Sequence, residues 1–168
     1  MTGVISIDSP VGRLTVVADG DAITAVHWGD NRRYEPTPLL AEARRQLQAY
    51  FAGQLTDFDL PLRPTGSPFD RRVWAAMRQI PHGRTSSYGE LAHAVDSAPR
   101  AVGGACGRNP IPIVIPCHRV LGRNGLGGYS GGEGLGTKRR LLALEGAIAG
   151  NGATKHSRDR ENASLRAH

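Results

Sequence analysis

Cysteine is scarce in this chain. Of its 168 residues only 2, Cys106 and Cys117, carry a thiol, which excludes a multi-disulfide scaffold and a four-cysteine zinc site. The sequence also lacks a signal peptide and any long apolar run of the kind that crosses a membrane. These absences predict a cytoplasmic protein with reduced thiols, without a metal site and without a membrane partner.

Acidic side chains are missing from one long segment. Residues 97–132 contain no Asp or Glu, whereas Arg100, Arg108, Arg119 and Arg123 all lie there. The whole chain has a formal net charge of +6. A basic balance favours an anionic partner such as nucleic acid, although solvated arginines also cluster by chance.

Residues 1–66 are predicted to form a small scaffold domain that ends in a linker. Short β-branched runs separated by Pro, Gly and Asp turns indicate a β-meander. The runs are residues 4–7, 14–18 and 23–28. A helix follows, with Thr37 as its N-cap and Pro38 in its first turn. Residues 57–62 alternate in polarity and predict a further, edge strand.

Residues 67–148 are predicted to form a mainly helical domain. The capping-box pattern at residues 87–90 starts one helix and Pro99 starts the next. Two short helices joined by a tight turn indicate a helix-turn-helix, although other helical hairpins look alike. Thr137 is expected to cap a last helix, and residues 149–168 are expected to be a disordered tail. The predicted class is α+β, with the N-terminal domain packed on the helical one.

The second helix of the pair is rich in glycine, because residues 100–107 read Arg-Ala-Val-Gly-Gly-Ala-Cys-Gly. Glycine costs about 1 kcal/mol relative to alanine in a helix interior. A smooth face that lets a partner such as DNA approach the backbone would offset this cost. Close packing against another helix would do so equally well, and the sequence leaves both explanations open.

The stretch at residues 113–120 reads Ile-Val-Ile-Pro-Cys-His-Arg-Val. Its β-branched run predicts a buried strand that stops at Pro116. Cys117 would then lie at a strand end beside His118, which suits a thiolate nucleophile as well as a buried structural cysteine. A carboxylate could orient the imidazole, and Glu145 is the candidate, although a glutamate at a helix end is more often a surface residue.

Residues 116–120, Pro-Cys-His-Arg-Val, resemble the active-site signature of the O6-alkylguanine-DNA alkyltransferase family, the methylated-DNA–protein-cysteine methyltransferases. Five further stretches resemble the family and occur in its order. They are Ser87-Tyr88-Gly89-Glu90-Leu91, Arg100-Ala101-Val102-Gly103-Gly104-Ala105, Asn109-Pro110, Tyr129-Ser130-Gly131-Gly132, and Leu141-Leu142-Ala143-Leu144-Glu145-Gly146. The resemblance covers residues 67–146 strongly and residues 1–62 more loosely.

The resemblance implies direct DNA repair. An alkyl group would pass from O6 of guanine in duplex DNA to Cys117, after the base has been flipped out from the minor groove. The thioether has no good leaving group, so the protein would be consumed in a single turnover without a cofactor. The implied partner is double-stranded DNA containing O6-alkylguanine, bound by a monomer. Activity on O4 of thymine and cooperative binding along DNA are left open.

The resemblance also implies catalytic roles. Cys117 would be the alkyl acceptor, His118 its base through a water molecule, and Glu145 the residue that orients His118. Asn109 would brace the site by hydrogen bonds to the backbone.

Further residues are implied to contact DNA or the lesion. Arg100 would fill the gap left by the flipped nucleotide, and Tyr88 would rotate the phosphate and donate to N3 of the base. Tyr129 would cover the lesion, and the Ser130 backbone would donate to O6. The remaining implied contacts are the carbonyls of Cys117 and Val120 to the exocyclic amine, Lys138 at the rim, and Ala101, Gly103 and Gly104 on the recognition helix.

Other functions fit parts of the sequence. A non-catalytic alkylated-DNA damage-binding protein would hold the lesion, but alkyltransferase-like proteins of that kind carry tryptophan where Cys117 stands. A thiol hydrolase leaves the glycine helix unexplained, and a transcription regulator leaves Cys117 and His118 without a role. Cys106, on the recognition helix, is interpreted as a small packing residue.

Overall fold

A computed structural model describes residues 2–30 and 32–148 of the chain, so the tail predicted at residues 149–168 lies outside the described residues. The chain separates into two compact units. The first consists of Met1–Thr65 with Pro110–Val114, and the second of Gly66–Asn109 with Ile115–His168. The return of Pro110–Val114 to the first unit is a departure from the two continuous domains predicted from the sequence.

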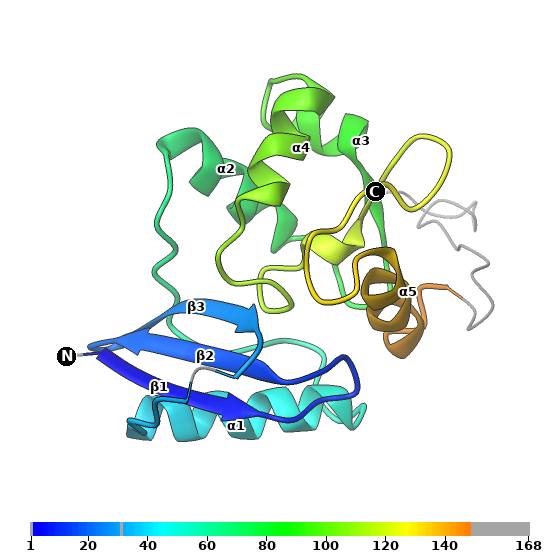
Figure 1. Cartoon of the computed structure of the whole chain (residues 1–168). Helices are drawn as coiled ribbons and strands as arrows, with labels where there is room; N and C mark the ends of the chain where they lie inside the picture. The colour runs from blue at the N-terminus through cyan, green and yellow to red at the C-terminus, as the bar shows by residue number, and fades with distance from the viewer. Residues whose placement is uncertain (1, 31, 149–168) are drawn as a thin grey trace. The chain divides into compact units, whose positions relative to one another are not determined.

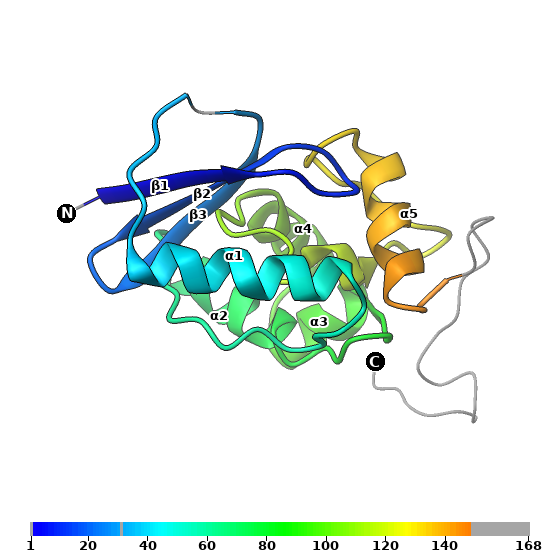
Figure 2. The ribbon, with the colours of Figure 1, turned by 90° about the horizontal axis from the view of Figure 1, so that it is seen from below.

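The first unit contains the predicted meander. Strands β1 (Thr2–Ile7), β2 (Leu14–Asp19) and β3 (Ala22–Trp28) form an antiparallel sheet in chain order (Figure 1). Helix α1 (Pro38–Phe51) lies along one face of this sheet (Figure 2). The Thr37 hydroxyl accepts the Leu40 N–H at 3.2 Å and so caps the helix as predicted.

The edge strand predicted at residues 57–62 is wrong. Only Leu62 bridges to the sheet, opposite Ile23. The backbone of Asp59 is paired instead with a side chain, because its N–H donates to Gln46 Oε1 at 2.8 Å and its carbonyl accepts from Gln46 Nε2 at 3.0 Å. A buried amide therefore satisfies the backbone groups that a neighbouring strand would otherwise satisfy.

The strand predicted at residues 113–115 is also wrong. Residues 113 and 114 form a turn, and Ile113 has a left-handed backbone with φ +76°. Burial was predicted correctly, since Ile111 and Ile113 are 0% exposed. Prolines at positions 110, 112 and 116 lack the N–H that a continuous ladder needs, so the apolar run folds as a buried turn.

The second unit is mainly helical, as predicted. It contains α2 (Pro68–Met77), α3 (Tyr88–Ala94), α4 (Pro99–Gly107) and α5 (Leu135–Leu144), together with the 3₁₀ helix η1 (Cys117–Arg119). Strands β4 (Ser86–Ser87) and β5 (Val120–Leu121) pair in parallel. Helices α3 and α4 pack on each other across a tight turn (Figure 1), which is the expected helix-turn-helix pair.

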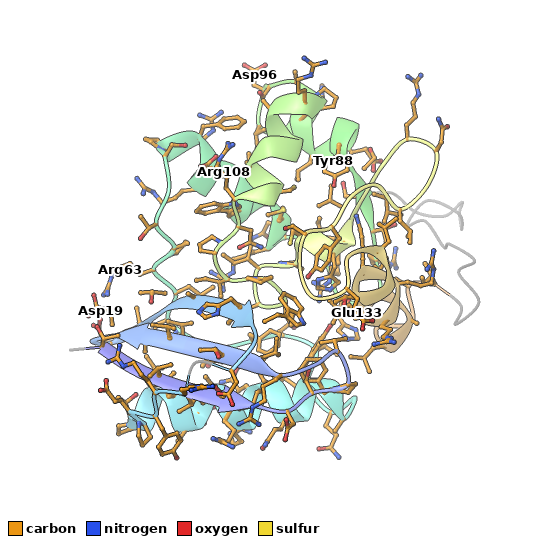
Figure 3. The ribbon with its side chains drawn as sticks, in the orientation of Figure 1. Asp19, Arg63, Tyr88, Asp96, Arg108 and Glu133 are labelled. Carbon is orange, nitrogen blue, oxygen red and sulfur yellow. The ribbon has the colours of Figure 1, made fainter. Side chains whose placement is uncertain are left out.

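Trp74 anchors α2 against α4 inside this unit. Its side chain is 1% exposed, and its indole N–H donates to the Ala105 carbonyl at 2.8 Å. Gly66 leaves the room that the indole needs, because a Cβ there would lie 2.4 Å from Trp74 Cη2. Arg108 extends from the end of α4 (Figure 3) and binds the buried carboxylate of Asp70 at 2.7 Å. These contacts fix the position of α4 within the unit.

Helix α5 begins three residues earlier than predicted, because its N-cap is Gly134 and not Thr137. Gly134, with φ +68°, precedes its first residue, and Thr137 lies within its first turns. The Thr137 hydroxyl accepts the Glu133 N–H at 2.8 Å, so it satisfies a loop group rather than a helix N–H. The sequence did not distinguish these two uses of one hydroxyl.

Candidate active site

Cys117 opens the short 3₁₀ helix η1 and is buried. The Asn109 amide donates to the Ile115 carbonyl at 2.8 Å, which ties the end of α4 to the backbone just before the cysteine. Burial raises the pKa of the Cys117 thiol, and hydrogen bonds from Asn109 and Tyr129 together with the charge of Lys138 act in the opposite direction. The thiol is therefore protonated at rest but surrounded by groups that stabilise a thiolate.

His118 and Glu145 meet in the interior of the unit. His118 Nε2 lies 2.7 Å from Glu145 Oε2, and both side chains are 0% exposed. Because a 3₁₀ helix has about three residues per turn, the side chains of Cys117 and His118 diverge by roughly 120°. The imidazole thus points toward α5, where Glu145 caps the C-terminal end.

Arg119 completes this buried cluster. Its Nε donates to Glu145 Oε1 at 2.8 Å and a terminal nitrogen donates to Oε2 at 3.1 Å, so the guanidinium binds the carboxylate with two parallel bonds. The other terminal nitrogen donates to the Ile80 carbonyl at 2.6 Å. Arg119 thereby neutralises the carboxylate that holds His118.

Charge states follow from these contacts. Burial alone would raise the pKa of Glu145, but His118 and Arg119 outweigh it and hold that pKa well below its usual range. Burial lowers the pKa of His118, so the imidazole is neutral at pH 7. An ionised carboxylate accepts only, which assigns the proton to Nε2 and the lone pair to Nδ1. Nδ1 is buried and has no hydrogen-bond partner among the described residues.

The Cys117 side chain faces a cavity of about 340 Å³, a size typical of small-molecule sites. Its lining comes from α3, α4, η1 and the loop before α5: Tyr88, Gly103, Cys106, Gly107, Cys117, Gly128, Tyr129 and Ser130. The residues predicted to contact a lesion, Tyr88, Tyr129 and Ser130, thus lie around the thiol.

Tyr88 is positioned by two local signals. Ser87 accepts the Glu90 N–H at 2.9 Å, and Glu90 in turn accepts the Ser87 N–H at 2.9 Å, which is the predicted capping box. Ser87 also pairs with Leu121 in the β4–β5 sheet. Tyr88 follows directly at the start of α3 (Figure 3), and burial raises its pKa to about 12, so the hydroxyl remains a donor.

The glycines of α4 do not serve packing within the unit. Cβ atoms built at Gly103 and Gly107 meet no atom within 4 Å, and only Gly104 faces a neighbour, the Arg108 side chain at 3.2 Å. Arg100 and Ala101 are exposed on the same helix. Of the two explanations left open by the sequence, close helix packing therefore fails at Gly103 and Gly107.

Lys138 lies in the interior rather than at the rim of the site. It is 0% exposed, and its ammonium donates to the carbonyls of Val120 at 2.7 Å, Leu126, and Gly128 at 3.1 Å. The Val120 carbonyl predicted to accept a base amine is thus already bound once. Since a carbonyl oxygen has two lone pairs, its role toward the base stays a prediction.

Arg119 is the member of the His118–Glu145 cluster to which the sequence analysis gave no role. Two features of the sequence could have indicated its importance. Arg119 follows Cys117-His118 directly, and residues 97–132 contain no acidic residue that could pair with it. A buried arginine needs a partner, and that partner had to come from outside the segment.

Within the described ranges, 2–30 and 32–148, no helix is long and apolar enough to cross a membrane.

Fold and site define an α+β protein in which a helix-turn-helix and a buried cysteine line one cavity, and the cysteine is followed by an imidazole–carboxylate pair. Residues 4–64 match the ribonuclease-like domain, and residues 68–147 the DNA binding domain, of 6-O-methylguanine DNA methyltransferase. The chain belongs to the 6-O-methylguanine DNA methyltransferase family. The resemblance and the α+β class inferred from the sequence are thereby confirmed.

Individual relatives agree with this assignment. The chain is 48% identical over 151 residues to the methylated-DNA–protein-cysteine methyltransferase of Mycolicibacterium paratuberculosis, covering 83% of this chain and 90% of that protein. It is 44% identical over 152 residues to the constitutive enzyme of that name from Bacillus subtilis, covering 82% and 92%.

Solved structures are similar as well. The crystal structure of Mycobacterium tuberculosis O6-methylguanine methyltransferase superposes with a TM-score of 0.77 at 44% identity, covering 87% of this chain and 93% of that one. Mycobacterium tuberculosis OGT in complex with DNA superposes with a TM-score of 0.76 at 47% identity, covering 84% and 91%.

Proposed function

We propose that this protein repairs alkylated DNA directly, by irreversible transfer of an alkyl group from O6 of guanine in duplex DNA to Cys117. One observation carries the proposal: a buried thiol opens onto a 340 Å³ cavity while the adjacent histidine is held neutral against Glu145. The names of the relatives, methylated-DNA–protein-cysteine methyltransferases, agree with this reaction.

The chemistry proceeds in two steps. Nδ1 of the neutral His118 takes the thiol proton through a bridging water, while Glu145 stabilises the imidazolium that forms. The thiolate of Cys117 then attacks the alkyl carbon, so an S–C bond forms as the C–O bond breaks. Guanine leaves with the electron pair on O6 and is protonated. The thioether product cannot expel its alkyl group, so each molecule reacts once and needs no cofactor.

Helix α4 is the proposed DNA contact. Gly103 and Gly107, where an added Cβ would meet no atom within 4 Å, allow the backbone to come close to the minor groove, and the exposed Arg100 fills the space of the flipped nucleotide. Flipping costs a few kcal/mol, and less for a damaged base. The substrate lies inside the cell, so we place the protein in the cytoplasm, acting as a monomer on double-stranded DNA.

Stoichiometry tests the proposal. Incubation with a short duplex containing O6-methylguanine is expected to add one methyl group per protein chain, as read by intact mass, and peptide mapping is expected to place it on Cys117. A Cys106→Ser variant, which lacks the other thiol of the chain, should still gain one methyl group per chain. Repeated turnover, or a protein that binds the duplex and stays unmodified, would contradict the proposal, and the second result would indicate a non-catalytic damage-binding protein.

Gly103→Ala is expected to separate stability from DNA binding. Since a Cβ at Gly103 meets no atom within 4 Å, the variant should gain about 0.5–1 kcal/mol in free energy of unfolding. The added methyl should nevertheless weaken duplex binding several-fold, because it stands where the backbone approaches DNA. Gly136→Ala in α5, also with no atom within 4 Å, is the control and should leave binding unchanged. If Gly103→Ala bound the duplex as tightly as the wild type, the glycines of α4 would not be needed for close approach to DNA.

A further inference from the structure

Lys138 is a buried charged group that the reaction above does not use. Its three acceptors are all backbone carbonyls, and they come from two places in the chain. Val120 follows η1, which carries Cys117. Leu126 and Gly128 belong to the loop that leads to Tyr129 in the cavity wall. A single side chain from α5 therefore joins the cysteine segment to the wall that faces it.

Besides Lys138, this loop is held by a bridge between Gly122 and Gly125 and by the packing of Leu126 against a buried apolar cluster. It is rich in glycine, which loses more conformational freedom on ordering than any other residue. Gly127 has φ +74°, and a Cβ there would lie 3.0 Å from the ring of Tyr88, so the loop packs closely while offering few side chains as anchors. An ammonium carries three N–H donors, which matches the three carbonyls around Lys138.

We propose that Lys138 is a positioning residue, whose ammonium holds residues 126–130 as a fixed wall of the lesion cavity and stabilises the Cys117 thiolate across it. The inference rests on the proposed alkyl transfer and adds Lys138 to the residues that serve the same site. Lys138 acts through the loop and through charge, and it does not touch the reacting atoms.

Electrostatics around Lys138 agree with this role. The positive charge lowers the pKa of Cys117 and also that of His118, which favours thiolate and neutral imidazole. Burial lowers the pKa of Lys138 itself to about 8, against the opposing influence of Cys117 in η1 and Cys106 in α4. From α3, the Tyr88 ring lies with its centroid 5.9 Å from Nζ. As pH rises through 8, the lysine loses its charge and one of its three donors.

Loss of this charge does not unfold the protein. The pKa is about 8 in the folded chain and 10.5 in the ordinary case, so the unfolded chain binds more protons between those values. The free energy of unfolding therefore rises with pH in that window. If the contribution of Lys138 to the reaction rate declines above pH 8, the cause therefore lies in the site and not in a loss of global stability.

Lys138→Met tests the inference, with Arg139→Met as the matched control, because it removes one exposed charge from the same helix. With free O6-methylguanine base as substrate, wild type is expected to react about tenfold faster than Lys138→Met at pH 7, the effect of one pKa unit on thiolate population. That ratio should shrink toward one by pH 9. Arg139→Met should match wild type throughout.

Hydrogen exchange gives a second, independent measurement. Amides of residues 122–130 are expected to exchange several-fold faster in Lys138→Met than in wild type, with α1 unchanged. Should the variant not fold, the same amides in wild type are compared at pH 7 and pH 9 after correction for intrinsic exchange, and a specific acceleration is expected. Equal rates at every pH, or an unaltered loop, would overturn the role of Lys138. A wild type that never accepts the methyl group would instead contradict the alkyl transfer, while the exchange measurement would still report on the loop.

Discussion

Glu145→Gln is expected to slow alkyl transfer by about 100- to 10,000-fold, the range seen when a general base is lost or held in the wrong tautomer. In the wild type the ionised carboxylate accepts the proton of His118 Nε2 at 2.7 Å, which leaves Nδ1 as the basic atom. An amide at position 145 can donate to Nε2 instead. The proton then moves to Nδ1, and the histidine no longer takes the thiol proton.

The rate is measured by single-turnover methyl transfer followed by intact mass, with Cys117→Ser giving the background. Glu133→Gln is the matched control, because Glu133 is an exposed carboxylate in the loop before α5 (Figure 3) and its change should leave the rate within a factor of two or so. Duplex binding should survive in both variants. If Glu145→Gln reacted at the wild-type rate, the buried histidine would not be the base.

Arg119→Met is expected to lower the free energy of unfolding by about 3–5 kcal/mol, the usual effect of removing one partner from a buried ion pair. The guanidinium holds both oxygens of Glu145 at 2.8 and 3.1 Å, and all three side chains of this cluster are buried. Without it the buried carboxylate loses both guanidinium bonds and faces a neutral imidazole. Urea denaturation at pH 7 measures the change, and Arg123→Met, an exposed arginine of the same segment, should shift stability by less than about 0.5 kcal/mol.

Acid unfolding supplies the companion measurement. The pKa of Glu145 is lowered in the folded chain, so this group contributes stability that is present above its usual pKa of 4.5 and is lost as pH falls toward the lower folded value. In Arg119→Met that pKa rises, and the acid transition should move to higher pH. A variant with wild-type stability at both pH values would show that the cluster is not a structural element.

Local signals in the sequence predicted elements that depend on neighbours in the chain. The Thr37 cap and the capping box at Ser87 and Glu90 are decided within four residues, and both were found. The two strands that failed depend on distant groups. Gln46 supplies the partner for Asp59 from another element, and Ile113 is held in a left-handed turn by its burial, against its β-branched preference.

The candidate site divides in the same way. Cys117 and His118 are adjacent, so the local sequence alone made them candidates. Glu145 lies 27 positions away from His118. Its place at the end of a predicted helix made it a candidate that could equally have been a surface residue, and the resemblance then implied its role. Lys138 was predicted from the resemblance alone. The family pattern indicated its position in the sequence, but it did not indicate that the side chain is buried or that its ammonium donates to three backbone carbonyls. The burial of a side chain and the identity of its hydrogen-bond partners depend on how the whole chain packs, so the residue spacing within one helix does not predict them.

The indole of Trp74 makes α4 observable without a label. The chain has 2 tryptophans. Of these only Trp74 is fully enclosed, and its N–H donates to the carbonyl of Ala105 in the last turn of α4. Emission from a buried indole responds to the loss of such a bond. A Trp28→Phe background would leave Trp74 as the single fluorophore, so that any shift of the helix as a duplex docks could be followed in time by stopped-flow fluorescence.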